Sequence, residues 1–184
     1  MINKIFSTAC LAAVVSSNAL AAECQPEGSY EQFAFQPPNG FVELRARTAQ
    51  NGITYTFRED KLESESAAII QLSFNYTKDD FSLLKPEFQD EAKELYITRY
   101  ITGIESRRAD FKKSAVTGET IGNSAYKKIV WSGKAGAEQF KGFMYVTIIN
   151  NVVTVLNLLI PSPGEEELEK TIYGCLGTLK LTLD

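Results

Sequence analysis

The chain contains no histidine among its 184 residues. Histidine is the commonest general base and metal ligand in proteins, so its absence excludes Ser-His-Asp and Cys-His catalysis and disfavours a zinc site. The chain also lacks the glycine-rich phosphate-binding loop, the dinucleotide-binding fingerprint and the Gly-x-Ser-x-Gly nucleophile elbow. These absences predict a protein with no cofactor, no bound metal and no catalytic residue of the common kinds.

Positive charge is scarce as well. Lysine and arginine number 19 against 23 aspartates and glutamates, which gives a net charge of -4. A nucleic-acid partner is therefore not expected, because such proteins carry a basic stripe that neutralises phosphates. No uninterrupted apolar run reaches the roughly 20 residues that a membrane-spanning helix needs, so a spanning protein is not expected either.

Residues 1–22 are typical of a bacterial secretory signal peptide. Lys4 supplies the positive start, Ile5–Val15 is a short apolar run, and Ala19–Ala21 has the small-x-small pattern of a cleavage site. We expect the mature chain to begin near Ala22 or Glu23 and to work in the periplasm, or else to be secreted. The remaining residues, about 160, suffice for one domain.

Cysteine is rare, with three residues in the chain. Cys10 lies within the expected leader; lipid attachment there is the alternative, but the apolar run of a lipoprotein precedes its cysteine, whereas here most of it follows. Cys24 and Cys175 remain, and an even pair in an exported protein predicts a disulfide. A redox-active pair is the other interpretation, which the lack of a Cys-x-x-Cys pattern disfavours.

The first half of the mature chain predicts strands. Residues 23–39 form an extended, proline-containing N-terminal segment, and a single domain is expected over residues 40–184. Strands are expected near Phe41–Arg47 and Ile53–Arg58, joined at Asn51-Gly52 because both residues of an Asn-Gly turn tolerate positive φ. A third strand is expected over residues 67–76.

A long helix is predicted over residues 86–108. Pro86 suits a first helical turn, and apolar residues then recur at spacings of three and four, as on one face of a helix. The residues of this expected inner face are Phe88, Ala92, Leu95, Ile97, Tyr100, Ile101 and Ile104.

The second half predicts more strands and a short helix. Candidate strands cover residues 113–119, 124–133, 139–149 and 152–160, and the last two join at Asn150-Asn151. Their nearly continuous apolar character predicts central strands covered on both faces. A capping box over residues 162–165 begins the short helix, and a final strand follows from Leu179. The fold class expected is α+β, with a mostly antiparallel sheet of about six to eight strands packed with one long central helix and a short C-terminal helix.

This order of elements resembles the PsbP-like fold of DcrB-like periplasmic proteins. The likeness lies in the opening strand from Gly40-Phe41, the long helix before the strands ending in residues 140–160, and the short acidic helix leading into Cys175–Leu181. The resemblance covers most of the mature chain and implies a binding or accessory protein. It brings no catalytic residues with it.

Two groups of residues are candidate binding sites. The basic cluster Arg107, Arg108, Lys112 and Lys113 is a candidate docking patch for an acidic partner or an anionic lipid headgroup. Its alternative interpretation is a favourable helix C-terminus followed by a solvated loop. Three aromatic residues, Tyr96, Tyr100 and Trp131, are a candidate apolar groove, with core packing as the alternative.

Catalytic interpretations find less support. Residues 82–85 and 124–127 match Ser-x-x-Lys, but the Ser-Asp-Asn and Lys-Thr-Gly motifs that accompany it in penicillin-recognising enzymes are absent, so the matches are attributed to chance. The acidic pairs Asp79-Asp80 and Glu59-Asp60 are interpreted as solvated loops, because no calcium-loop spacing surrounds them.

The sequence favours an exported, non-enzymatic binding or accessory protein that acts through protein–protein recognition, with another envelope protein as its partner. A specific version is an immunity-type inhibitor of an envelope-acting toxin. The alternatives are a carrier of a lipid or hydrophobic ligand, which requires an apolar pocket between the long helix and the sheet, and an enzyme with carboxylate-based catalysis, which requires a positioned pair of carboxylates.

Overall fold

A computed structural model of the protein describes residues 24–61, 66–162 and 166–183. The expected leader and residues 163–165 of the expected capping box lie outside these ranges. Ser162, the first residue of that box, is the last residue of a strand and pairs with Gln139.

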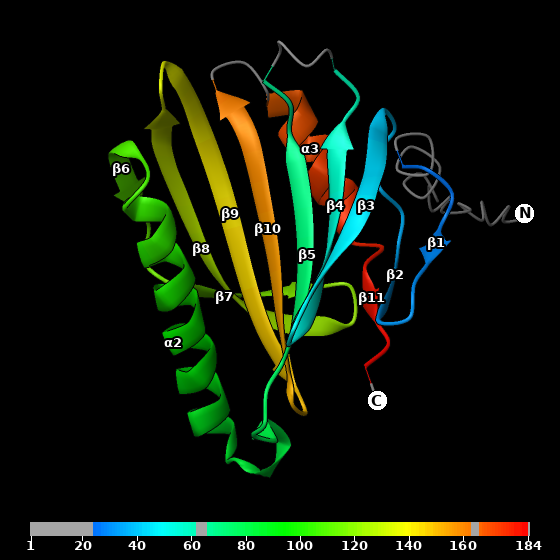
Figure 1. The fold of residues 1–184 in the computed structure, drawn as a ribbon, viewed down its shortest axis with the longest axis vertical. Coiled ribbons are helices and arrows are strands. Elements are labelled where there is room, and N and C mark those ends of the chain that lie inside the picture. Colours follow the sequence, from blue (N-terminus) through cyan, green and yellow to red (C-terminus); the bar gives the residue numbers. More distant parts are fainter. Residues whose placement is uncertain (1–23, 62–65, 163–165, 184) are drawn as a thin grey trace, which may run out of the picture.

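The main sheet contains eight strands, and every pairing in it is antiparallel. The strands are β3 (Phe41–Ala49), β4 (Gly52–Glu59), β5 (Ile69–Tyr76), β6 (Ala109–Lys113), β7 (Thr117–Ile121), β8 (Ser124–Ala135), β9 (Glu138–Ile149) and β10 (Val152–Ser162). Their order is β3-β4-β5-β10-β9-β8-β6, and β7 also pairs with β8 (Figure 1). This arrangement confirms the expected α+β class and strand count.

The hairpin turns follow the expected positions, with one correction. Asn150 adopts a positive φ of 53° between β9 and β10, as an Asn-Asn turn favours. The β3–β4 turn instead occupies Gln50 and Asn51, and Gly52 is already the first residue of β4. A Cβ at Gly52 would overlap the backbone carbonyl of Phe74 on β5, so this glycine permits close approach of two strands and does not form a positive-φ turn.

One strand prediction was wrong. The expected strand at residues 113–119 is divided into β6 and β7, which pair with successive parts of the 12-residue strand β8. Residues 114–116 connect them, and Ser114 stays attached by donating its backbone N–H to Val130 O at 2.9 Å. Both short strands, β6 and β7, pair along the single long strand β8. The alternation of residues within 113–119 could not reveal this division.

Two helices pack on the sheet, α2 (Pro86–Glu105) and α3 (Glu166–Leu176), and a short 3-10 helix, η1 (Phe81–Leu83), precedes α2. The long helix is confirmed but ends three residues before the expected residue 108. Its inner face was predicted in part wrongly: Ile97 and Ile101 are buried, whereas Phe88 and Leu95 are 48% and 63% exposed. Apolar residues occur on both sides of α2, so spacing alone could not select the buried side.

The N-terminal segment is extended, as expected, and it also contributes to the core. Strands β1 (Gly28–Ser29) and β2 (Phe33–Phe35) form a small antiparallel sheet with β11 (Lys180–Leu181). Phe33 and Phe35 are buried. The predicted disulfide between Cys24 and Cys175 is confirmed and joins this segment to α3 across 151 residues of chain.

The sheet carries a hydrophobic cluster on each face, because successive side chains of a strand point to opposite sides. The α3 face, named here for the helix that covers it, includes Phe143, Tyr145 and Leu156 beside Ile172 of α3. The α2 face includes Trp131, Met144 and Val155 beside Ile97 and Ile101 of α2. Strands β9 and β10 are thus covered on both faces, as their apolar character predicts.

Candidate functional site

The arginines of the predicted basic patch are bound to the protein itself. Arg107 lies just after α2 and donates its Nε–H to Gly103 O at 2.8 Å, which satisfies a carbonyl at the helix end. The guanidinium of Arg108 lies over Trp131 and Phe140, 5.9 Å from each ring centroid. Both arginines therefore have structural roles at the C-terminus of the helix.

The two lysines of that patch are separated by the sheet. Lys112 and Lys113 are consecutive in β6, so their side chains leave the strand on opposite faces. On the α2 face, Lys113 Nζ lies 2.8 Å from a carboxylate oxygen of Glu105. Lys112 is directly opposite Ser132 on the other face and makes no hydrogen bond or ion pair within the described residues. The four basic residues do not form one continuous surface.

The three residues of the predicted groove do lie in one cluster, between α2 and the sheet. Trp131 is 2% exposed and stacks on Phe111, with ring centroids 5.8 Å apart. Tyr96 packs edge to face with Phe81, and burial raises the pKa of Tyr100. A Cβ at Gly142 would overlap the Trp131 ring, so the indole lies directly on the backbone of β9. The cluster is packed in the manner of a core.

The residues considered for catalysis have other partners. The hydroxyl of Ser82 is 2.6 Å from Asp80, whose carboxylate also accepts the backbone N–H of Ser82 and caps η1. Lys127 Nζ is 3.1 Å from Asp90 and 3.0 Å from Glu94. Within the described parts of the chain, no group of three or more acidic, cysteine or histidine side chains is placed to hold a metal ion.

An exposed apolar surface was not foreseen from the sequence. Seven large apolar side chains of the described residues are exposed, and four of them lie on η1, on the residue that caps its C-terminus, and on α2. They are Leu83 (83% exposed), Leu84 (40%), Phe88 (48%) and Leu95 (63%), and we call them the outer α2 face. The amphipathic pattern contained Phe88 and Leu95, but it assigned both to the core.

Charged residues border the outer α2 face. Glu87 and Glu91 are exposed and make no ion pair within the described residues, whereas the neighbouring Asp90 and Glu94 are bound by Lys127. Arg99 is exposed one turn beyond Leu95. The apolar surface is therefore accompanied by uncompensated carboxylates at its N-terminal half and a guanidinium at its C-terminal half.

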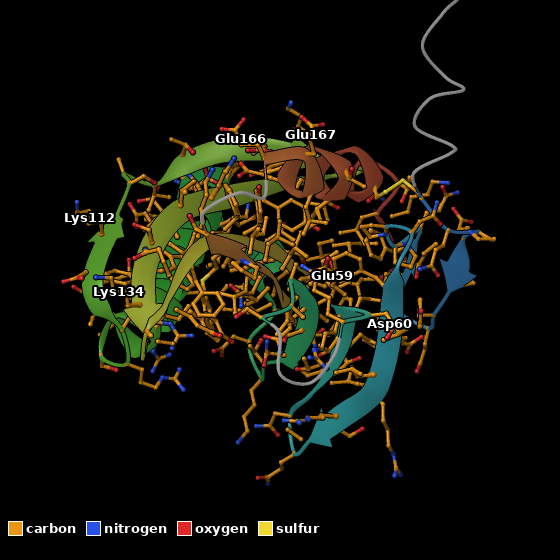
Figure 2. The ribbon with its side chains drawn as sticks, turned by 90° about the horizontal axis from the view of Figure 1, so that it is seen from above. Glu59, Asp60, Lys112, Lys134, Glu166 and Glu167 are labelled. Carbon is orange, nitrogen blue, oxygen red and sulfur yellow. A yellow bond between two sulfur atoms is a disulfide. The ribbon has the colours of Figure 1, made fainter. Side chains whose placement is uncertain are left out.

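A pocket of about 320 Å³ lies where β6, β8, β9 and β10 meet. Its lining residues are Lys112, Lys113, Ser114, Val130, Trp131, Ser132, Gln139, Phe140, Lys141 and Ser162. Figure 2 shows Lys112 and Lys134 on the β6 side of the sheet, whereas the labelled acidic residues lie at α3 and at the end of β4. Sequence reasoning named Lys112 and Lys113 but could not combine them with residues of three other strands.

The apolar interior on the α3 face is closely packed. The gap bounded by Phe35, Phe57, Ile70, Leu72, Leu156, Leu176 and Leu179 does not admit a water-sized guest. Among the described residues, no helix combines the length and apolar composition needed to cross a membrane.

Comparison with known proteins places the fold. No family model matches the chain, and no curated protein matches it. The solved structure of PsbP (CyanoP) from the cyanobacterium Synechocystis sp. PCC 6803 is similar over 96% of this chain and 98% of that one, at 10% identity and a TM-score of 0.57. The Ran-binding protein Mog1p of Saccharomyces cerevisiae is similar over 84% of this chain and 94% of its own, at 11% identity and a TM-score of 0.53.

A protein from Bacteroides thetaiotaomicron is also similar, at 11% identity and a TM-score of 0.51 over 83% of this chain, which spans only 46% of that protein. The chain therefore has the fold shared by PsbP and Mog1, and the expected fold-level resemblance is confirmed. Identities this low establish the fold alone.

Proposed function

We propose that the protein is an exported, non-enzymatic binding or accessory protein that recognises another protein through the outer α2 face. The observation that carries the proposal is the exposure of Leu83, Phe88 and Leu95 on one short stretch of chain. Exposed apolar side chains that gather on one surface are typical of interaction sites, whereas scattered ones need no explanation.

The buried contacts of α2 with the sheet come from its other side. The inner side of α2 closes the α2 face with Ile97 and Ile101, which are 0% and 1% exposed. Polar residues at positions 88 and 95 would leave those contacts intact and would lower the cost of exposing apolar surface to water. The apolar character of positions 88 and 95 is therefore better explained by binding to a partner than by the stability of the fold.

The charges around the surface define the partner's chemistry. A complementary protein presents apolar side chains to Phe88 and Leu95, basic groups to Glu87 and Glu91, and an acidic group to Arg99. An immunity-type inhibitor of a basic, envelope-acting toxin is the more specific form of this proposal. Mog1p supports the general form, because its name states that it binds another protein, Ran.

Export is supported by two features of the chain. The first 22 residues have the pattern of a bacterial leader, and the Cys24–Cys175 disulfide belongs to an oxidising compartment such as the periplasm. The proposed partner is therefore another protein of the cell envelope.

The test compares two pairs of exposed apolar residues. Leu83→Ser with Leu95→Ser changes the outer α2 face, and Val42→Ser with Leu44→Ser is the matched control on edge strand β3, where both residues are also exposed. Envelope proteins retained by the wild type are identified, and the affinity of the purified partner is measured by titration calorimetry. We expect the outer-face variant to lose at least about tenfold in affinity while the control does not.

Both variants should keep their free energy of unfolding within about 0.5 kcal/mol of the wild type, since all four residues are on the surface. A partner that binds the outer-face variant as tightly as the wild type would refute the proposed surface. The absence of any retained envelope protein would refute the recognition function itself.

A further inference from the structure

We infer that the pocket at β6, β8 and β9 is a second binding site, which holds a phosphate group attached to an apolar body. Its centre is a cross-strand row: Ser132 on β8 is directly opposite Lys112 on β6 and directly opposite Lys141 on β9. Directly opposed residues point to the same face, and neighbouring strands lie about 4.8 Å apart. Lys112 and Lys141 therefore flank Ser132 on the same face of the sheet. Because the serine side chain is short, the space between the two lysines forms the pocket.

The positive charge of this row is only partly compensated. Lys112 makes no ion pair within the described residues, and the nearby carboxylate of Asp110 is bound to Lys134 at 2.6 Å. Lys141 Nζ binds both carboxylate oxygens of Glu169, at 2.7 and 2.8 Å, and an ammonium group has a third donor left. No acidic side chain lines the pocket. An anion is consequently the favoured occupant.

The remaining lining specifies what kind of anion fits. Gln139 is directly opposite Ser162 in the next cross-strand row, and together with Ser132 they add an amide and two hydroxyls to the two ammonium groups. A phosphate group has several acceptor oxygens that can use such donors at once, which a simple halide cannot. Val130 supplies apolar surface beside the donors, on the same face of the sheet as Ser132. A volume of about 320 Å³ leaves room for a small organic group beside the phosphate.

This site is separate from the outer α2 face. Lys112, Ser132 and Lys141 lie on the α3 face of the sheet, whereas α2 covers the opposite face. The two sites can therefore be tested independently. The phosphate can come from a soluble phosphate ester or from the headgroup of an anionic lipid, since both present the same group to the row.

The experiment uses phenyl phosphate as the probe and follows backbone amide chemical shifts of the mature, disulfide-bonded chain. We expect saturable shifts at Ser132, Gln139 and Lys141. Lys112→Ser should weaken binding at least about tenfold, because it removes a charge-assisted hydrogen bond. Lys78→Ser is the control: it removes an exposed lysine that does not line the pocket, and should leave the affinity unchanged.

Two further measurements sharpen the test. Ser132→Leu fills the pocket and should abolish binding, with folding checked by the retained amide spectrum. Benzyl alcohol has a similar ring without the charge and should bind at least about tenfold more weakly than phenyl phosphate. The inference is overturned if phenyl phosphate gives no saturable shifts at these residues, if benzyl alcohol binds equally, or if the two lysine variants behave alike.

A binding assay with lipid vesicles identifies the source of the phosphate. Vesicles of phosphatidylglycerol with phosphatidylcholine are compared with pure phosphatidylcholine by cosedimentation. Binding to the anionic vesicles that Lys112→Ser abolishes assigns a lipid headgroup to the site. Binding of phenyl phosphate without vesicle binding assigns a soluble phosphate ester. Both results support the site, and the probe titration decides whether it exists.

Discussion

The two faces of the sheet are closed in different ways. The α3 face is covered by α3, by the small sheet β1-β2-β11 and by the disulfide between Cys24 and Cys175. The α2 face is covered mainly by one helix, without a covalent link. The α3 face is therefore closed by several elements that are also bonded to one another, whereas the α2 face is closed by a helix attached through side-chain contacts.

The helices themselves differ in the same sense. The 11-residue helix α3 buries Ile172, Cys175 and Leu176, whereas the 20-residue helix α2 buries only Ile97 and Ile101. Much of α2 thus remains at the surface, and that surface is apolar in part. The comparison indicates that α3 is held mainly by its buried side, whereas α2 closes a core with one side and leaves apolar side chains exposed on the other, the surface proposed above for recognition.

The largest effect is expected from opening the disulfide. Replacing Cys24 and Cys175 together by alanine should lower the free energy of unfolding by about 2–5 kcal/mol, because the bond closes a loop of about 150 residues and restricts the unfolded chain. Alanine is chosen because Cys175 is fully buried and serine would add an unpaired hydroxyl. Urea denaturation of both proteins, each with and without reductant, measures the change.

Reductant should destabilise the wild type and leave the alanine variant unaffected. Equal urea midpoints for the oxidised wild type and the variant would contradict the idea that the covalent bond secures the α3 face. Such a result would assign that role to the apolar contacts of Phe33 and Phe35.

Much of the fold follows from local patterns in the sequence. The β9–β10 hairpin, the long helix and the disulfide each depend on neighbouring residues or on a count of cysteines, and all three are confirmed. The pairing of β2 with β11 was not predicted, because it joins segments about 145 residues apart and depends on no periodic pattern. The division of β6 from β7 escaped prediction for a related reason, since it depends on the length of their common partner.

The second test contrasts two residues of α2 that are two positions apart. Ile97→Ala should cost about 2–5 kcal/mol of unfolding free energy, because it leaves a cavity at a side chain that is 0% exposed. Leu95→Ala removes a side chain of equal size that is 63% exposed, and should change stability by less than about 0.5 kcal/mol. Thermal and urea unfolding of the two variants measure the difference.

Similar losses at the two positions would show that the outer α2 face is part of the folding core. The distinction between the two sides of α2 would then fail, and with it the basis for a recognition surface. A large difference in stability between the two variants would support the distinction between the buried and exposed sides of α2, because a helix that closes a core needs only one of its sides.

The candidate sites were less predictable than the fold. The basic patch was assembled from residues that are close in sequence, but the alternation of β6 sends Lys112 and Lys113 to opposite faces. The row of Lys112, Ser132 and Lys141 depends on the register of three strands, which no single segment encodes. Residues near each other in the chain were thus separated, and residues far apart were brought together.

The smallest effect is expected from the ion pairs that attach the N-terminal half of α2 to the sheet. Lys127 of β8 binds Asp90 and Glu94 of α2 at 3.1 and 3.0 Å. Because both carboxylates are about half exposed, Lys127→Met should lower the unfolding free energy by less than about 1 kcal/mol at neutral pH. Lys170→Met is the matched control on α3, where the pair with Glu167 is more exposed and should contribute no measurable stability.

The pH dependence of the Lys127 effect has a definite sign. Hydrogen bonds from Lys127 and Lys93 hold the pKa of the Asp90 carboxyl below its usual value near 3.8. The folded protein therefore binds fewer protons than the unfolded chain in this range, so the stabilisation is fully present above about pH 4 and is lost as the pH falls through the folded pKa. The difference between the wild type and Lys127→Met should shrink accordingly between about pH 4 and pH 2, and also in about 1 M salt, where exposed charges are screened. A difference that persists at low pH and high salt would mean that the aliphatic part of Lys127 holds α2 by packing, and the two faces of the sheet would then differ less in how they are closed.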